Sequence, residues 1–308
     1  MVVVLLSLLH AAAFAEEERV QPMRGLLIPE VFHATDSERF STNKIRTGFL
    51  PTYTHGERYT GVAYQQNRYA QDAWSTKTEQ VSVITKAINP RTGLGYQLNV
   101  GLGQSDRGSL ITTDSSYGFQ LSDQNKMEVF ANRDRVETQQ ALNNGIYYTL
   151  VGTSLEHKVT ERLSAIVLGG AMLFSDNNTR PIVRARVIYD LDPTHGVTVQ
   201  LRFRQFRDTD TLVTNHYFNP TTYSETMALI GMRRRIEGWV VSGLAGVGRQ
   251  AVNQDPDTQT KLLELSVVSP VARQDYYLKA RAGYSKSEGW MGPNYLYRHI
   301  TGELVIPF

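Results

Sequence analysis

Apolar and polar residues alternate along most of the chain, in segments of about ten residues that turn residues separate. The pattern is clearest in residues 94–102, 197–204 and 276–284, where one parity is apolar and the other carries Gln, Asn, Thr, Lys or Arg. Almost no segment has a helical period. Because successive side chains of a strand point to opposite faces, the alternation predicts strands with one face in lipid and the other in a polar lumen.

The lengths of the connections support a barrel of about sixteen strands between Gly25 and Phe308. The short connections are expected at residues 55–57, 89–93, 123–125, 160–162, 192–196, 237–238 and 272–274. The longer ones that interleave with them are expected at residues 134–144, 208–222, 250–258 and 287–294. Short periplasmic turns alternating with longer external loops are typical of outer-membrane barrels. The prediction is an all-β, transmembrane antiparallel barrel over residues 25–308, with both termini in the periplasm.

The two ends of the chain predict the same compartment. The apolar run 2–9 is followed by Ala13, Phe14 and Ala15, which predicts a signal peptide over residues 1–15. No Lys or Arg precedes this run, which leaves the position of the true start open. Residues 16–24 are expected to form a short periplasmic lead-in. At the other end, residues 304–308 alternate and stop at Phe308, which resembles the C-terminal assembly signal of bacterial outer-membrane barrels. The resemblance implies outer-membrane localisation and recognition by the barrel-assembly machinery.

Composition excludes several other classes of protein. A mean hydropathy of -0.32 and the lack of a long apolar segment exclude a helical membrane protein. The absence of cysteine excludes disulfides and thiolate metal sites, and a net charge of +2 gives no reason to expect nucleic acid as a partner. The histidines are scattered, and the sequence contains neither an HExxH motif nor a Gly-x-Ser-x-Gly elbow. We therefore expect no enzymatic activity, no metal and no cofactor.

Charged residues on the predicted lumen face give the first indication of function. Sixteen strands leave an aqueous lumen, so transport is the leading functional class. The turn at residues 192–196 makes two arginine-bearing strands neighbours, and their guanidinium groups would then form a cationic strip. One interpretation is a binding track for an anionic or hydroxyl-rich solute. The other is a network of lumen salt bridges with Glu264, Glu303 and Glu128. The cations concerned are Arg184 and Arg186, Arg202 and Arg204, and further round the barrel Lys279 and Arg281.

Two predicted loops allow a more specific comparison. Residues 133–142 and then 217–223 resemble, in kind and order, segments of the barrels that secrete exopolysaccharides, the poly-N-acetylglucosamine and cellulose export porins. The resemblance implies a 16-stranded pore through which a growing polysaccharide passes passively, driven by its synthesis at the inner membrane. Tyr217, Phe218 and Tyr223 would then stack on sugar rings near the external mouth. The alternative is that Tyr-Phe-Asn-Pro is a turn entering a strand, with its rings in the interfacial girdle.

The chain departs from that family in one respect, because those exporters usually carry a periplasmic tetratricopeptide array and no repeat of that period occurs here. Either a separate periplasmic tetratricopeptide protein supplies the scaffold, or the chain is a barrel-only descendant or fragment. The other partners expected are the polysaccharide chain, outer-membrane lipid and lipopolysaccharide.

Two further functions stay open: a general or small-solute diffusion porin, and a surface-binding or phage-receptor barrel. An exporter should show an aromatic and polar track along the lumen. A porin should show an inward-folded loop carrying acids opposite a basic ladder, and residues 208–222 are the expected constriction loop. A receptor needs long, ordered external loops, and the loops expected here are modest.

Overall fold

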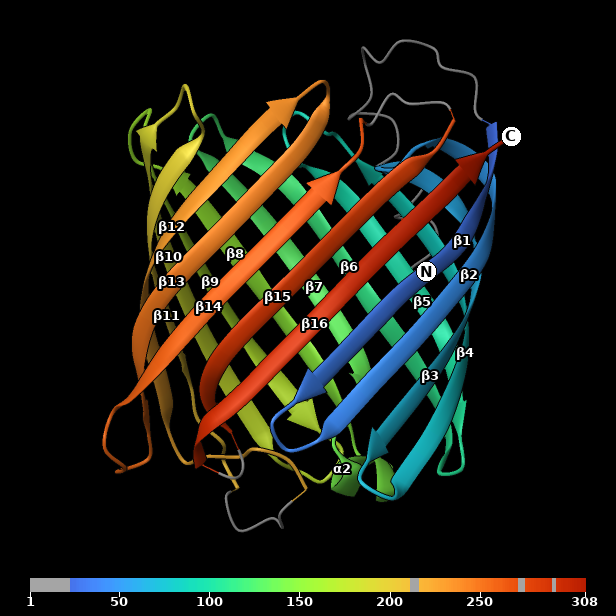
Figure 1. Cartoon of the computed structure of the whole chain (residues 1–308), viewed down its shortest axis with the longest axis vertical. Helices are drawn as coiled ribbons and strands as arrows, with labels where there is room; N and C mark the ends of the chain where they lie inside the picture. Colours follow the sequence, from blue (N-terminus) through green and yellow to red (C-terminus); the bar gives the residue numbers. More distant parts are fainter. Residues whose placement is uncertain (1–22, 211–215, 271–274, 290–291) are drawn as a thin grey trace.

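In a computed structural model, sixteen antiparallel strands form one closed barrel (Figure 1). The structure describes residues 23–210, 216–270, 275–289 and 292–308. Each strand pairs with the next in sequence, and β1 pairs with β16 to close the barrel. The all-β prediction and the strand count are confirmed. The elements are β1 (Met23–Asp36), β2 (Phe40–His55), β3 (Arg58–Gln71), β4 (Trp74–Ile88), β5 (Gly95–Ser105), β6 (Gly108–Ser122), β7 (Asn125–Arg135), α2 (Gln139–Asn143), β8 (Tyr147–Lys158), β9 (Leu163–Phe174), β10 (Thr179–Asp192), β11 (Val197–Phe206), β12 (Tyr223–Ile236), β13 (Trp239–Val252), β14 (Thr258–Val268), β15 (Tyr277–Gly289) and β16 (Gly292–Pro307).

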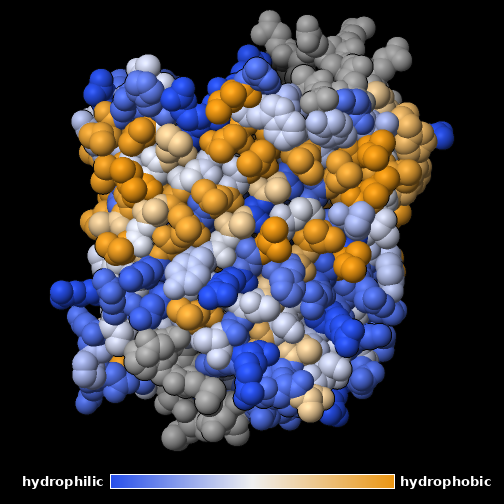
Figure 2. All heavy atoms as spheres, viewed as in Figure 1, coloured by the Kyte–Doolittle hydropathy of each residue, from blue (hydrophilic) through white to orange (hydrophobic). Residues whose placement is uncertain are grey.

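The exterior of the barrel is apolar, as the alternation predicts. On β5, for example, Leu98, Val100 and Leu102 are exposed on the outer face. On the face shown in Figure 2, apolar residues form a band across the half of the barrel nearer Met23 and the C-terminus, and hydrophilic residues dominate the other half. An apolar surface of this extent requires lipid as its surroundings. Among the described residues, no helix is long and apolar enough to span a bilayer.

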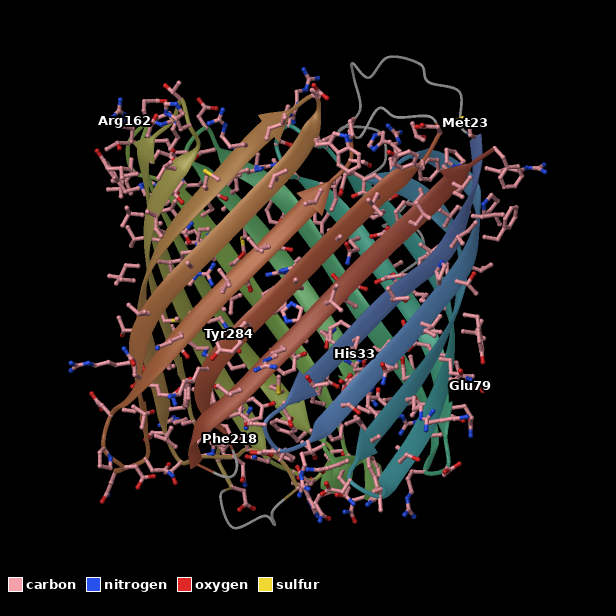
Figure 3. The ribbon with its side chains drawn as sticks, viewed as in Figure 1. Met23, His33, Glu79, Arg162, Phe218 and Tyr284 are labelled. Atoms are coloured by element: carbon pink, nitrogen blue, oxygen red, sulfur yellow. The ribbon has the colours of Figure 1, made fainter. Side chains whose placement is uncertain are left out.

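Met23, the first described residue, and the C-terminus lie at one end of the barrel, here called the terminal end, and the opposite end is called the loop end (Figures 1 and 3). Met23 and Arg162 are at the terminal end, and Phe218 is at the loop end (Figure 3). Short connections at the terminal end agree with the prediction at residues 56–57, 89–94, 123–124, 159–162, 193–196 and 237–238. The predicted turn at residues 272–274 lies outside the described residues.

The loop-end connections are shorter on the whole than the sequence predicts. Two long connections occur where expected, at residues 136–146 and 207–222, and a shorter one spans 253–257. The predicted long connection at residues 287–294 is wrong, because β15 and β16 stay paired as far as Gly289 and Gly292. The remaining loop-end connections are short and comprise residues 37–39, 72–73, 106–107 and 175–178.

The first and last strands form the seam of the barrel. The backbone N–H of Phe308 donates to the carbonyl of Arg24 at 2.8 Å, and the N–H of Arg24 donates back at 3.1 Å. Met23 and Arg24, expected in the lead-in, therefore belong to the barrel. The predicted signal peptide, residues 1–15, and the rest of the lead-in lie outside the described residues. The assembly role of Phe308 stays a prediction.

Candidate functional site: the lumen and its loop-end mouth

Four arginines form a strip along the lumen wall on β10 and β11. The turn at residues 193–196 sets the register, so that Arg184 lies opposite Arg204 and Arg186 opposite Arg202. All four line a cavity of about 570 Å³ within the lumen. The sequence predicted this arrangement because residues two apart on a strand share a face and a short turn makes the two strands neighbours.

Only part of the strip is neutralised. Arg204 donates to the carboxylate of Glu225 at 2.8 Å and to the hydroxyl of Tyr223 at 2.7 Å. Arg186 donates to the neutral side-chain oxygen of Gln200. Within the described part of the chain, Arg184 and Arg202 form no ion pair. The strip therefore keeps net positive charge facing the lumen.

A second charged group lies on β14, β15 and β16. Arg281 forms an ion pair of 2.8 Å with Glu264. Lys279 lies opposite Glu303 in the register of β15 and β16. Glu128 lies on β7, many strands away. Arg281 therefore belongs to a lumen salt bridge, as the second interpretation predicts. Arg184 and Arg202 fit the first interpretation, an open cationic track.

The β11–β12 connection is anchored at the mouth by a buried ion pair. The guanidinium of Arg180 donates to both carboxylate oxygens of Asp208, at 2.9 to 3.2 Å, and Asn178 donates to the same group at 3.0 Å. The Asp208 side chain is fully buried. Burial raises the pKa of the Asp208 carboxyl, although the hydrogen bonds and charge of Arg180 oppose the rise. This clamp holds the connection against the barrel wall.

The three predicted mouth aromatics lie at the loop end, but two of them do not present free ring faces. Tyr217 is buried and stacks on Phe174, with ring centroids 4.4 Å apart. Tyr223 is also buried and stacks on Phe206 at 4.6 Å. Both hydroxyl groups are hydrogen-bonded. The expectation that these two rings stack on sugars is therefore corrected: they build the wall of the mouth. Phe218 is half-buried and lines the mouth cavity, edge-on to Tyr223.

The loop that crosses the mouth is the β7–β8 connection, which we had not expected to be the constriction. Glu137 forms an ion pair with Lys44 at 2.5 Å and accepts a hydrogen bond from Thr42 at 3.3 Å, both on β2. In the barrel β2 and β7 are separated by four strands. Asn143 of α2 accepts a hydrogen bond from the indole of Trp74 at 3.0 Å. Of the predicted constriction loop 208–222, residues 216–218 line the same mouth cavity, and residues 211–215 lie outside the described residues.

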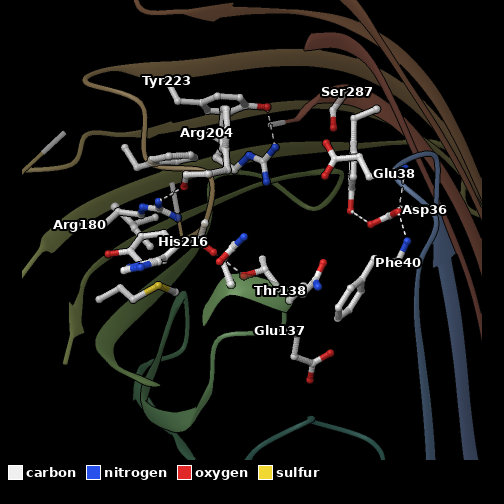
Figure 4. Close-up of a pocket in the computed structure, with 18 of the residues that line it drawn as sticks. Asp36, Glu38, Phe40, Glu137, Thr138, Arg180, Arg204, His216, Tyr223 and Ser287 are labelled. Carbon is white, nitrogen blue, oxygen red and sulfur yellow. Dashed lines mark hydrogen bonds between the residues drawn. The ribbon is translucent and has the colours of Figure 1, made fainter. Parts of the chain in front are cut away.

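The β11–β12 connection supports the crossing loop, because the Thr138 hydroxyl donates to the backbone carbonyl of His216 (Figure 4). Sequence reasoning missed the roles of Glu137 and Lys44. One signal was present: Thr138 caps α2, its side chain accepting from the N–H of Ala141. A helix cap inside a connection indicates a compact loop.

The mouth encloses a cavity of about 520 Å³ whose charges are segregated (Figure 4). Asp36 and Glu38 lie on one side, on the β1–β2 hairpin, and Arg180 and Arg204 lie on the other. Arg180 and Arg204 are neutralised by Asp208 and Glu225, so the net positive charge of that side comes from Arg184, which also lines the cavity. The Asp36 carboxylate is held in place by the N–H groups of Glu38 and Phe40, each at 2.9 Å. This arrangement imposes an electric field across the mouth.

Near the terminal end, one side of the lumen is filled by apolar side chains. Leu50, Tyr53, Ile84, Tyr277 and Val305 are buried together there, with Leu27 and Ala63. The β2–β3 turn lies against this cluster, since a Cβ added at Gly56 would be 2.3 Å from the Tyr277 ring. Because apolar residues cover part of this cross-section, the polar path runs along the remaining wall. Among the described residues, no group of three or more His, Asp or Glu side chains is placed to bind a metal.

No known family model matches the chain, and no curated protein matches it in sequence. Solved structures match its fold. A bacterial polysaccharide outer membrane secretin aligns with 93% of this chain and 98% of its own, at 12% identity and a TM-score of 0.66. The chain has an outer-membrane barrel fold. OprD from Pseudomonas aeruginosa aligns with 93% of this chain and 94% of its own, at 10% identity and a TM-score of 0.46. Fold and apolar exterior together assign the barrel to the bacterial outer membrane.

Proposed function

We propose that the chain is an outer-membrane pore through which a secreted polysaccharide passes passively. The observation that supports this most is the arginine strip, where Arg184 and Arg202 face the lumen and, among the described residues, form no ion pair. A planar guanidinium group binds carboxylates and other oxygen acceptors at low cost in side-chain order. A strip of such groups suits a chain rich in hydroxyl and anionic groups. The fold likeness to a polysaccharide secretin agrees with this proposal.

The proposed orientation has the terminal end in the periplasm and the loop end outside the cell. The position of the apolar band, nearer to the terminal end, supports it, because external parts of such barrels extend further from the membrane (Figure 2). A polymer would then enter beside the apolar cluster, follow the strip and leave through the mouth. We propose transport as the whole of the activity, with no catalytic step.

A small-solute porin is the second candidate, and the crossing β7–β8 loop favours it. Glu137 on that loop and the arginine strip on the far wall correspond to the acid-bearing loop and basic ladder expected of a diffusion porin. Both candidates share a water-filled lumen, so they differ in how the pore responds to the length of a solute.

Single-channel recording separates the two candidates. Oligosaccharides of uronic acid and neutral oligosaccharides of equal length would be added to the purified protein in a planar bilayer. A polymer pore should give blockades whose duration grows with chain length, and longer ones for the anionic series. A small-solute porin should show blockade by the shortest sugars and exclusion of long ones. A protein with no conductance would contradict both proposals.

The matched variants test the strip itself. Arg184→Gln with Arg202→Gln should shorten the blockades by the anionic series and leave those by the neutral series almost unchanged. Arg281→Gln with Glu264→Gln is the control, because it removes a lumen ion pair without changing net charge. If both pairs of substitutions had equal effects, the strip would not be the binding track.

A further inference from the structure

Four neighbouring strands carry a cation on the outer face of the barrel, at the loop-end boundary of the apolar band. On β13 Arg249 follows the exposed Val247, and on β14 Lys261 lies two residues from the exposed Leu263. On β15 Lys286 lies two residues from Tyr284, and on β16 Arg298 lies two residues from the exposed Ile300. The outer cation patch is defined as Arg249, Lys261, Lys286 and Arg298.

The strand register makes these four residues contiguous. Lys261 and Lys286 lie directly opposite each other on β14 and β15. Arg298 lies opposite Tyr284, one outward position from Lys286. Arg249 lies opposite Gln259, one outward position from Lys261. Tyr284, in the lower part of the wall in Figure 3, marks the level of the patch.

The patch has no internal compensation for its charge. Within the described part of the chain, none of its four members forms an ion pair, and like charges directly opposite each other on a sheet are destabilising. Other strands carry uncharged residues at the corresponding outward position, next to an exposed apolar residue: Asn43, Gln104, Ser109, Thr149 and Gln205. On β4 the residue is Glu79, and on β7 Arg133 is bonded to Thr149 and stacked on Tyr147. A second pair of outward cations, Arg68 and Lys77, lies directly opposite on β3 and β4, with Glu79 two residues from Lys77 on the same face of β4. Among the described residues, four neighbouring strands each carry an outward cation only in the outer cation patch.

We propose that the outer cation patch binds the phosphate groups of lipopolysaccharide in the outer leaflet. A cation at the edge of an apolar band lies at the depth of lipid headgroups, and ammonium and guanidinium groups bind phosphate through charge-assisted hydrogen bonds. A phosphorylated glycolipid supplies several anionic groups on one face, which suits a patch that spans four strands. The inference rests on the orientation given under Proposed function and is independent of what passes through the lumen.

The test is a binding titration of the full chain in detergent micelles with fluorescent lipid A carrying both phosphates. Each basic residue near an anionic lipid surface contributes about 1 kcal/mol, so Lys261→Gln with Lys286→Gln should weaken binding by about 30-fold. Arg249→Gln with Arg298→Gln is a second variant pair in the same patch. Arg162→Gln with Arg234→Gln is the matched control, since it removes two exposed cations that lie outside the patch.

Three further measurements make the outcome decisive. Lipid A without phosphates should bind the wild type and the patch variants equally weakly. Inorganic phosphate should not displace the lipid at equal phosphate concentration, and complete displacement would assign the patch to a free anion instead. The difference in SDS-gel mobility between boiled and unboiled samples checks that every variant is folded. Equal losses in the patch and control variants, or no loss in either patch variant, would overturn the proposal. Pore conductance is recorded separately, so a failed transport proposal leaves this result interpretable.

Discussion

The ion pair between Glu137 and Lys44 should control how far the β7–β8 loop obstructs the mouth. Glu137→Gln removes the charge that draws the loop across the lumen to β2. The bonds of Asn143 to Trp74 and of Thr138 to His216 stay in place, so the loop should loosen without unfolding. We expect the channel to spend more time in a state of higher conductance.

The magnitude follows from the contacts that the substitution weakens. Glu137 accepts one hydrogen bond from an ammonium group and one from a hydroxyl. Hydrogen bonds to charged groups contribute roughly 1.5 to 3 kcal/mol each. Both ion-pair side chains are partly exposed, at 22% and 29%, which reduces the contribution through solvent screening. A loss of about 2 kcal/mol would change the ratio of docked to undocked loop by about 30-fold.

The assay is single-channel conductance in a planar bilayer, with dwell times recorded for each conductance level. Glu156→Gln is the matched control, because it removes one carboxylate from the Lys126–Glu156 pair on β7 and β8 and leaves the loop alone. Lys44→Gln should have a larger effect than Glu137→Gln, since it leaves Asp134 and Glu137 beside one another in the same cavity. Identical dwell times for wild type and Glu137→Gln would refute the view that this ion pair docks the loop.

Three other substitutions test separate parts of the structure. Asp208→Asn breaks a buried ion pair and should lower the unfolding free energy by about 3 kcal/mol in a urea titration. Glu161→Gln, in an exposed ion pair, should lower it by almost nothing. Equal losses would contradict the role of Asp208 as a clamp. Gly196→Ala should lower the urea midpoint, because Gly196 has a φ of 68° and an added Cβ would be 2.0 Å from a carbonyl oxygen. Gly169→Ala is the control: an added Cβ there meets open space, so the midpoint should not change. Arg184→Gln with Arg202→Gln should lower the anion-to-cation permeability ratio by about fivefold at low salt and less at high salt, measured as a reversal potential in a salt gradient; an unchanged ratio would contradict the open strip.

Local patterns predicted the barrel wall and the arginine strip because both depend on short-range information. A period of two assigns each residue to a face, and the turn at 193–196 makes β10 and β11 neighbours. The same reasoning failed for residues 287–294. Their Gly, Ser, Pro and Asn content is typical of a loop, yet β15 and β16 continue to pair there. Whether such a segment is a strand or a loop depends on its pairing with a neighbouring strand, and the propensity of one segment alone does not predict that pairing.

The crossing loop was not predictable from local pattern either. Lys44 and Glu137 are 93 residues apart, and neither belongs to a motif. Alternation shows that Lys44 faces the lumen, but it carries no information on which loop folds back to meet it. The prediction for the mouth aromatics was wrong for a related reason. Local sequence does not show that Phe174 and Phe206, on other strands, cover the rings of Tyr217 and Tyr223.

The segregation of charge in the mouth bears on which solutes the pore can pass. Asp36 and Glu38 lie on the β1–β2 hairpin, and the arginine strip lies on β10 and β11, about half of the sixteen-stranded barrel away. A small, strongly charged anion would be held at the arginine wall and repelled from the acidic one. A sugar chain that carries many hydroxyl groups can direct donors to the carboxylates and acceptors to the guanidinium groups in the same cross-section. It can then advance by exchanging equivalent contacts. The electric field between the acidic hairpin and the arginine strip therefore orients a polysaccharide, whereas it would trap a small anion.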